Sequence, residues 1–340
     1  MVLKRWIRHG IDVAALAVGK LTSMQRRCAG SAVVLMYHRV LPDRQCHGLP
    51  FEKLVVAQSH FREQIRWIAE NARHSPLIRA FDASASSDPK RPLVCVTFDD
   101  GYADNAEIAA PILDEFGVRA TFYVTTGFVE GGSTWFDRAG MHWERDASGC
   151  AEAIRTTEPG ANGVHRPATL DGFMTFMKRT DPVRRRDVLA ILDAQDDLAV
   201  PLAAYRPMTV GQVRALHERG HEIGSHTRSH GILPQFSARE LDEEIGGARE
   251  TLRAWTGGEV LGFCYPNGDY DDAVIAAVRR AGHAQACTVE RGIASPDDDP
   301  FRLRRRMISP TGASAPWGGA SLLAFRAEAF GLHDALRAAY

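Results

Sequence analysis

The sequence lacks the features that mark disordered, repeat or strongly charged proteins, so it is compatible with an ordinary globular protein. It contains no low-complexity tract and no repeat at the spacing of solenoid proteins. Its formal net charge is only −1, so the chain has no overall attraction to nucleic acid or anionic lipid, and we expect no nucleic-acid partner. With 340 residues and 45% hydrophobic content, it has enough apolar material for one large domain with additions, or for two domains.

Paired cysteines are also lacking. None of the six cysteines forms a CxxC pair, and Cys95 and Cys264 lie in apolar, strand-like segments where small buried thiols are common. We expect all six to be reduced, which fits a cytosolic or otherwise reducing compartment. A disulfide framework is the alternative.

Residues 1–30 are the exception in composition, because basic side chains surround a short apolar run at 13–18. That run is too short to span a bilayer. Asp12 and the lack of a small-residue cleavage site argue against a secretory signal. One interpretation is an amphipathic helix packed on its own domain. The other is a basic helix that lies on the membrane surface through residues 1–28, which would make the protein cytoplasmic and peripheral at the inner face of the membrane.

A cycle of helix, glycine stop and strand recurs along the chain. Helices are predicted at 105–116, 209–220, 237–255 and 272–280, and strands at 120–125, 221–225, 260–265 and 284–289. Such alternation implies parallel strands with helices outside them. In closed barrels of this kind the functional residues lie at the carboxyl ends of the strands.

The N-terminal part of the cycle is less regular. Residues 31–40 read as a buried strand that ends in His38-Arg39. A helix is predicted to begin near Ser59 as its N-cap, with an apolar face that contains Phe61, Ile65, Ile68 and Trp67.

Residues 128–207 interrupt the cycle and are predicted to form an insertion that acts as a lid or wall. Asp181-Pro182 is typical of an N-cap followed by proline at the first helical position, and Val183 belongs to the apolar side of the helix that follows. Trp135 and Trp143 could stack on sugar rings. More often, aromatic residues of this kind hold an insertion to its scaffold.

An apolar segment, 94–98, ends in two adjacent carboxylates and a glycine, Asp99-Asp100-Gly101, and the rest of the predicted site is organised around it. Adjacent side chains on an extended chain point to opposite sides. One carboxylate can therefore bind a metal while its neighbour stays free to accept a proton.

A second polar segment follows the strand at 221–225 and contains His226 and His230, four residues apart. Two imidazoles and a carboxylate such as Asp100 provide the three protein ligands of an open catalytic zinc site. The alternative is an ordinary polar loop. We favour the metal site because both motifs follow strands at the same edge. Zinc-bound water has a pKa of about 7 in favourable sites, so such a site could supply hydroxide at neutral pH.

The remaining carboxylate, Asp99, is then the candidate general base that takes a proton from water. The metal and a backbone N–H would stabilise a tetrahedral oxyanion, where the loss of one donor typically costs ~3 kcal/mol. A general acid must still protonate a leaving amine, and histidine has a suitable pKa.

At these residues the chain resembles the polysaccharide deacetylases, the NodB-homology or carbohydrate esterase family 4 enzymes, over residues 32–309. Thr-Phe-Asp-Asp-Gly at 97–101 matches the family's first motif, and Ser-His-Thr-Arg-Ser-His at 225–230 matches its second. The resemblance implies an α/β fold, a distorted (β/α)7 barrel, here with a helical insertion. It also implies Asp99 as catalytic base and a divalent metal, usually zinc, on three ligands: Asp100, His226 and His230.

The third motif departs from the family pattern, which usually reads Arg-x-Pro followed by an aromatic. Here the chain has Cys264-Tyr265-Pro266-Asn267. We still expect Tyr265, Pro266 and Asn267 to contact substrate or oxyanion, because the backbone N–H of Asn267 does not depend on its side chain. The missing arginine leaves open how Asp99 is oriented. Arg304, Arg305 or Arg306 could compensate, although such a charged run is more often a solvated strand edge.

The last two motifs are weaker. No match to the fourth is visible, and Leu332-His333 has only a faint likeness to the fifth. However, Leu-Met-Tyr-His-Arg-Val at 35–40 resembles the branch that includes biofilm poly-N-acetylglucosamine deacetylases, where a histidine at this strand end is thought to replace the acid. We therefore predict His38 as general acid, with His333 second. A structural role for His38, such as bonding the Asp99 loop, is the alternative.

The prediction is thus a barrel at 31–312 with an insertion at 128–207, preceded by a basic segment at 1–30 and followed by a helical tail at 313–340. The expected reaction is metal-dependent removal of N-acetyl groups from an N-acetylhexosamine-containing glycan or a lipid-linked sugar precursor. The competing hypothesis is a carbohydrate-binding protein of the same fold that has a metal site but no turnover.

Overall fold

The computed structural model describes most of the chain. The described residues are 6–7, 10–12, 14, 19–28, 30–82, 91–157, 167–195, 205–310, 313–315, 319–332 and 334.

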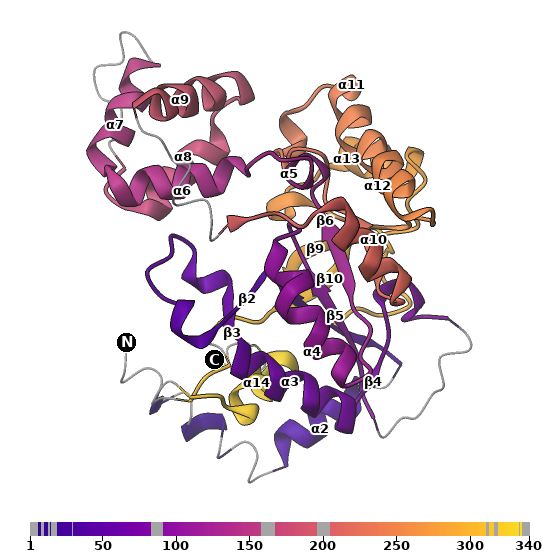
Figure 1. Cartoon of the computed structure of the whole chain (residues 1–340). Coiled ribbons are helices and arrows are strands. Elements are labelled where there is room, and N and C mark those ends of the chain that lie inside the picture. The colour runs from indigo at the N-terminus through magenta and orange to yellow at the C-terminus, as the bar shows by residue number, and fades with distance from the viewer. Residues whose placement is uncertain are drawn as a thin grey trace.

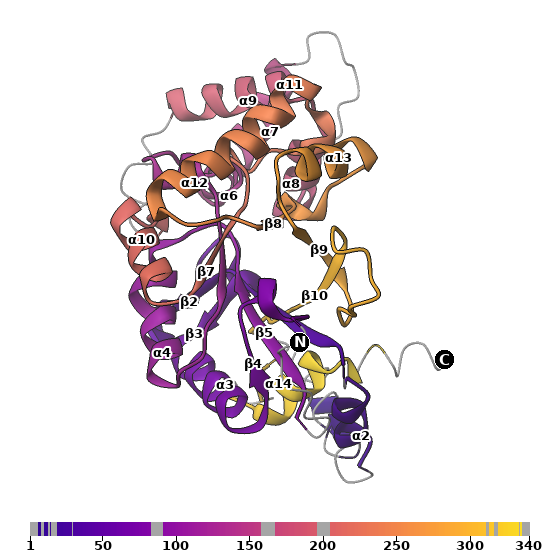
Figure 2. The ribbon, with the colours of Figure 1, turned by 90° about the vertical axis from the view of Figure 1, so that its right-hand side faces the viewer.

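A closed parallel barrel forms the centre of the molecule (Figures 1 and 2). Strand β1 pairs with both β5 and β10, which closes the sheet, and every pairing in the barrel is parallel. Its strands are β1 (Ala32–Tyr37), β5 (Leu93–Phe98), β6 (Thr121–Val124), β7 (Glu222–Ser225), β8 (Gly262–Cys264), β9 (Gln285–Arg291) and β10 (Leu303–Met307). The predicted (β/α)7 barrel is confirmed.

Among the described residues, three short strands lie outside this ring. β4 (Arg73–His74) extends the sheet beyond β5, and β2 (Arg39–Leu41) pairs with β3 (Val55–Ala57) in a separate ribbon. Every residue of β1, β5 and β6 is buried, as expected for parallel strands covered on both faces. Phe98 stacks on Phe122 at 5.1 Å and on Tyr37 at 5.5 Å between ring centroids, so aromatic packing ties these strands to one core.

Helices cover the outside of the barrel where the periodicity predicts them. They are α3 (Gln58–Asn71), α4 (Ala110–Glu115), α10 (Val210–Glu218), α11 (Ala238–Leu241), α12 (Ala248–Thr256) and α13 (Asp272–Arg280), with α2 (Lys20–Arg27) and α14 (Leu322–Ala329) near the ends of the chain. Both predicted capping boxes form, at Thr209 and Ser237. Gly257 adopts the left-handed conformation that ends α12.

The predicted start of α3 is wrong by two residues. The N-cap is Ala57, and Ser59 lies inside the first turn, where its hydroxyl donates to Asp43 Oδ2 at 2.6 Å. A serine within a helix start can satisfy its hydroxyl on a neighbouring segment, so its position alone does not identify the cap. The predicted apolar face is buried at Phe61 and Ile65.

Helices α6 (Trp135–Arg145), α7 (Ala147–Thr156), α8 (Leu170–Arg179) and α9 (Pro182–Gln195) gather beside one end of the barrel (Figure 1), following the short helix α5 (Thr126–Val129). They share an apolar cluster of their own. The Arg184 N–H donates to Asp181 Oδ1 at 2.9 Å, which confirms the predicted cap of α9. Val183 is 56% exposed, so its predicted place on the apolar side is wrong.

The two tryptophans of this segment hold it in place. Trp135 Nε1–H donates to the carbonyl of His230 at 2.9 Å, and Trp143 stacks on Phe173 at 5.3 Å between centroids. Both contacts lie within the protein, so the scaffold role of these aromatics is the one the structure supports.

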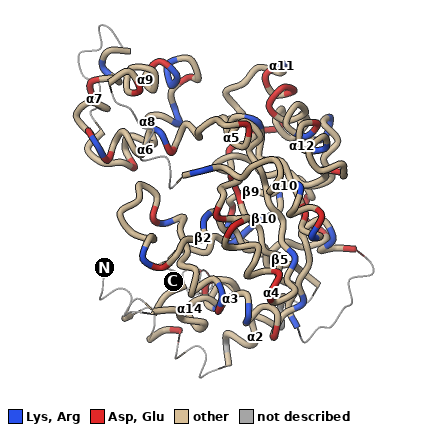
Figure 3. The backbone as a smooth tube through the Cα atoms, viewed as in Figure 1, with Lys and Arg blue, Asp and Glu red and all other residues tan. Residues whose placement is uncertain are grey.

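All six cysteines are free, as predicted. Among the helices of the described residues, none combines the length and apolar character needed to cross a membrane. Trp6 and Ile7 are more than half exposed, whereas much of residues 1–28 lies outside the described part, so peripheral membrane contact stays a prediction. Basic and acidic positions are interspersed along the backbone (Figure 3), in keeping with the near-zero net charge.

Candidate active site

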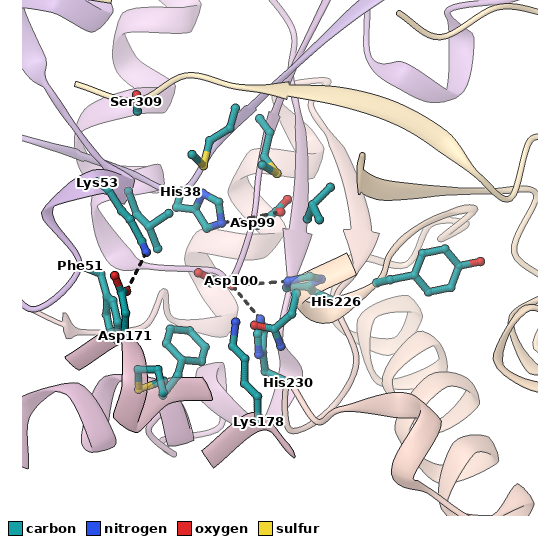
Figure 4. A pocket seen from close by; sticks show the side chains of 18 of the residues that line it. His38, Phe51, Lys53, Asp99, Asp100, Asp171, Lys178, His226, His230 and Ser309 are labelled. Atoms are coloured by element: carbon teal, nitrogen blue, oxygen red, sulfur yellow. Dashed lines mark hydrogen bonds and ion pairs between the residues drawn. The ribbon is translucent and has the colours of Figure 1, made fainter. Parts of the chain in front are cut away.

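A cavity of about 670 Å³ opens between the carboxyl ends of the barrel strands and helices α6 and α8 (Figure 4). His38 follows β1, Asp99 and Asp100 follow β5, and His226 follows β7. Because parallel strands bring their carboxyl ends to one edge, His38 and His226, which are 188 positions apart in sequence (226 − 38), meet in one cavity.

Asp100, His226 and His230 converge at the floor of this cavity. Asp100 Oδ1 lies 3.5 Å from His226 Nε2 and 3.4 Å from His230 Nε2. One ligand atom from each of the three lies within 4.8 Å of the others, and all three residues are buried. The two imidazole rings meet edge to face, with centroids 4.8 Å apart. The structure therefore brings together the three residues predicted as metal ligands.

The chain adopts strained backbone conformations to achieve this convergence. Among the described residues, the non-glycine residues with positive φ are Asp100 (80°), Thr227 (66°), His230 (55°) and Asn267 (56°). All four lie on loops around the cavity, and the left-handed region costs a residue with a side chain roughly 1 kcal/mol or more. Strain that collects at one place is typical of functional sites.

Two features of these ligands fit a bound cation. His226 Nδ1 lies 2.8 Å from the carbonyl of Cys264, so a proton on Nδ1 would leave the Nε2 lone pair facing the site. Asp100 Oδ2 is buried without a hydrogen-bond partner in the described part of the chain, and such an oxygen is costly unless something binds it. One carboxylate and two imidazoles are a donor set that suits zinc.

Asp99 points to the other side of the chain and is held by Arg305 from β10. Arg305 Nη1 donates to Asp99 Oδ1 at 2.8 Å and Nη2 donates to Oδ2 at 2.7 Å. The guanidinium is itself fixed, because Nε donates to the carbonyl of Thr288 at 2.9 Å and Nη1 to Thr97 Oγ1 at 3.2 Å. This bidentate pair sets the orientation of the Asp99 carboxylate.

The pKa values of the two aspartates follow from these contacts. Burial raises the pKa of Asp99, but the Arg305 guanidinium more than offsets this effect, so its pKa lies below the ordinary value. Burial acts in the same direction on Asp100, and hydrogen bonds to His226 and His230 bring the pKa of that carboxyl well below its usual range. Both carboxylates are therefore ionised at neutral pH.

The arginine run at 304–306 does not behave as a uniform solvated edge. Arg304 is exposed, with Nη2 3.3 Å from Asp298 Oδ1, whereas Arg305 is only 1% exposed. Arg305 Nη2 also lies 3.0 Å from Cys264 Sγ, at the position where the family pattern has its arginine. Burial raises the pKa of Cys264, so the thiol stays protonated beside the guanidinium. An arginine from β10 thus binds the Asp99 carboxylate and lies against the cysteine on β8.

His38 lines the same cavity beside Asp99. Its Nε2 is 4.0 Å from Asp99 Oδ2, and its side chain is 15% exposed (Figure 4). The carbonyl of His38 accepts from Asn105 Nδ2 at 2.8 Å, which anchors the loop after β1. His333, the second candidate acid, lies outside the described residues.

The third-motif residues occupy the side of the cavity after β8. Tyr265 and Asn267 line it, whereas Pro266 is buried and is not among the lining residues. The Tyr265 hydroxyl donates to the carbonyl of Phe301 at 3.0 Å, so this residue presents its ring rather than a free hydroxyl. Asn267 Nδ2 is buried without a partner among the described residues, which leaves an amide donor in the cavity wall.

Some lining residues carried no signal in the sequence. Phe51, Phe136, Lys53 and Lys178 reach the cavity from the β2–β3 loop and from helices α6 and α8. Arg305 had a usable signal, because Leu303, Arg305 and Met307 alternate along β10 and successive side chains of a strand face opposite sides. Arg305 therefore falls on the buried side of β10, with Leu303, whereas Arg304 falls on the exposed side.

The chain belongs to the polysaccharide deacetylase family. The sequence model described as "Polysaccharide deacetylase" matches residues 86–157 and 185–286, about half of the chain, and includes both aspartates and both histidines. The protein YxkH of Bacillus subtilis (strain 168), named for the same family, is 19% identical over 287 residues, which covers 84% of this chain and 74% of YxkH. The predicted family is confirmed.

Solved structures show the same fold. The deacetylase PplD of Streptococcus pyogenes, in complex with acetate, superposes with a TM-score of 0.56 at 19% identity and covers 85% of this chain and 96% of PplD. IcaB of Ammonifex degensii gives a TM-score of 0.54 at 19% identity, with 86% and 98% covered.

Proposed function

We propose that this polysaccharide deacetylase removes N-acetyl groups from an N-acetylhexosamine-containing glycan or glycan precursor, with a divalent metal, zinc first among the candidates. One observation carries the proposal. A three-residue metal-ligand set, Asp100, His226 and His230, lies in the same cavity as a separate aspartate, Asp99, that a buried arginine keeps ionised.

A divalent metal held by Asp100, His226 and His230 would supply Lewis-acid chemistry, activating water and polarising the acetyl oxygen. The protein's own groups divide the proton transfers. Asp99 accepts the proton of the attacking water, since both its oxygens keep acceptor capacity beyond their bonds to Arg305. The oxyanion of the tetrahedral intermediate would be met by donors of Asn267 in the cavity wall.

The departing amine needs a proton, and His38 is the proposed donor. It lies in the cavity, with Nε2 4.0 Å from Asp99 Oδ2. Asp99 takes one proton from the attacking water and His38 gives one to the amine, so the two proton transfers balance. The carbon–nitrogen bond breaks, acetate leaves, and the sugar keeps a free amine.

The competing hypothesis is a sugar-binding protein of the same fold without turnover. Metal binding alone does not need an ionised aspartate beside the ligand set, nor the buried arginine that orients it. A charge pair of this kind is costly to bury, and metal binding by Asp100, His226 and His230 gives no reason for it. The Asp99–Arg305 pair therefore favours catalysis.

Metal removal tests the proposal. We expect purified, zinc- or cobalt-loaded protein to release acetate from N-acetylated chitooligosaccharides, and to lose this activity on chelation. Returning zinc should restore acetate release to the wild-type protein but not to Asp100→Ala, whose ligand set is incomplete. Metal content measured beside acetate release separates an unloaded site from a wrong substrate. Turnover that persists in fully metal-free protein would exclude this mechanism.

His38→Ala is expected to lower kcat by about 10²- to 10⁴-fold, the contribution of one positioned general acid. The measurement is acetate release at saturating substrate, with zinc content determined on the same preparation. His333→Ala serves as the matched control and should keep kcat. The reverse pattern would move the acid role to His333.

A further inference from the structure

The cavity contains a lysine that the proposed mechanism does not use. Lys178, near the end of α8, is half-buried and points into the cavity (Figure 4). Within the described residues, its ammonium group forms no hydrogen bond and no ion pair with a carboxylate. Burial lowers the pKa of Lys178, which reflects this lack of a direct counter-charge.

The other charged groups around the cavity have partners. Asp99 is bound by Arg305, Lys53 lies 3.5 Å from Asp171, and Arg291 pairs with Glu328. Asp269 and Asp171 act on Lys178 only over a longer distance, outside ion-pair range. An ammonium group taken out of water without a partner is unfavourable, so this position favours a ligand that provides one.

The position of Lys178 relative to the metal-ligand loop is fixed by its backbone. Its carbonyl accepts from Gln235 Nε2 at 2.9 Å, and Gln235 lies five residues after His230. Arg185 Nη2 donates to Gln235 Oε1 at 2.6 Å, which locks the amide in this orientation. The end of α8 is thus held against the segment that carries a candidate metal ligand, and the Lys178 ammonium faces the same space as the reacting groups.

We propose that Lys178 binds an anionic oxygen group of the substrate, and that the substrate class is an N-acetylated sugar that carries a phosphate ester or a carboxylate. This inference rests on the proposed function for the acetamido group. A lysine ammonium is a compact charge with three donors and binds phosphate and carboxylate oxygens strongly. A neutral sugar offers only hydroxyls to this position.

The test compares kcat/KM of zinc-loaded wild type and Lys178→Met on three substrates: an N-acetylglucosamine phosphate, an N-acetylhexosaminuronic acid and a neutral methyl N-acetylglucosaminide. We expect wild type to prefer an anionic substrate, and Lys178→Met to reduce the anionic-to-neutral ratio of kcat/KM by about ten- to hundredfold. Comparing kcat/KM for the sugar phosphate with kcat/KM for the uronic acid identifies which anion is preferred. Arg179→Met removes the same charge from the adjacent, exposed position and should leave the ratio unchanged.

Equal losses on anionic and neutral substrates in Lys178→Met would overturn the inference, since they would indicate hydroxyl binding or a structural role. If no substrate is turned over, the proposed function fails but the inference can still be decided. Calorimetry on the zinc-loaded protein would then measure binding of the sugar phosphate, the uronic acid and the neutral glycoside. An anion preference lost in Lys178→Met and kept in Arg179→Met supports the inference, and its persistence in Lys178→Met overturns it.

Discussion

Asp99→Asn is expected to lower kcat by about 10²- to 10⁴-fold while zinc content stays at the wild-type level. The amide has the shape of the carboxylate but cannot accept the proton of water, and the ligand set of Asp100, His226 and His230 is untouched. The measurement is acetate release under saturating substrate, with metal content determined on the same preparation.

One side effect must be separated from this loss. In Asp99→Asn the buried Arg305 guanidinium loses its counter-charge, so the free energy of unfolding should fall as well. Adding Arg305→Met removes that charge and should recover much of the stability without recovering activity. A recovery of activity in the double variant, or near-wild-type kcat in Asp99→Asn, would mean that Asp99 is a structural residue and not the base.

The parts of the site that the sequence made predictable are those set by strand ends. Asp99 and Asp100 follow an apolar run, and His226 and His230 follow another, so a parallel barrel must bring them to one edge. The backbone conformations at Asp100 and His230 were not predictable, because Asp and His are enriched at positive φ but still adopt negative φ at most positions. They are imposed by the surrounding fold.

Contacts that depend on tertiary packing were harder to foresee. Arg305 stood among three arginines, and only the alternation along β10 separates it from its neighbours. Lys178 lies on a helix of the insertion, where polar residues usually face solvent, and its place in the cavity depends on how α8 docks through Gln235. Helix periodicity indicates a buried face, but it does not indicate what lies opposite the other face.

Arg305→Met is expected to destabilise the protein by about 3–5 kcal/mol, because it leaves the Asp99 carboxylate buried without its partner. The same change should raise the pKa of Asp99, since the guanidinium is what offsets the effect of burial. Asp99 must be ionised to act as a base, so the acidic limb of the kcat/KM profile should move to higher pH. Chemical denaturation and a pH profile measure the two effects separately.

Cys264→Arg in the Arg305→Met background distinguishes positioning from general stability. Cys264 Sγ lies 3.6 Å from Asp99 Oδ2, so an arginine introduced at position 264 of β8 would have the same carboxylate within reach. An arginine there should restore the acidic limb toward the wild-type pH and recover part of kcat. The matched control, Cys264→Met in the same background, adds a long side chain without charge and should restore neither. If both variants behave alike, Arg305 acts only by filling the barrel interior, and the orientation of Asp99 must depend on other groups.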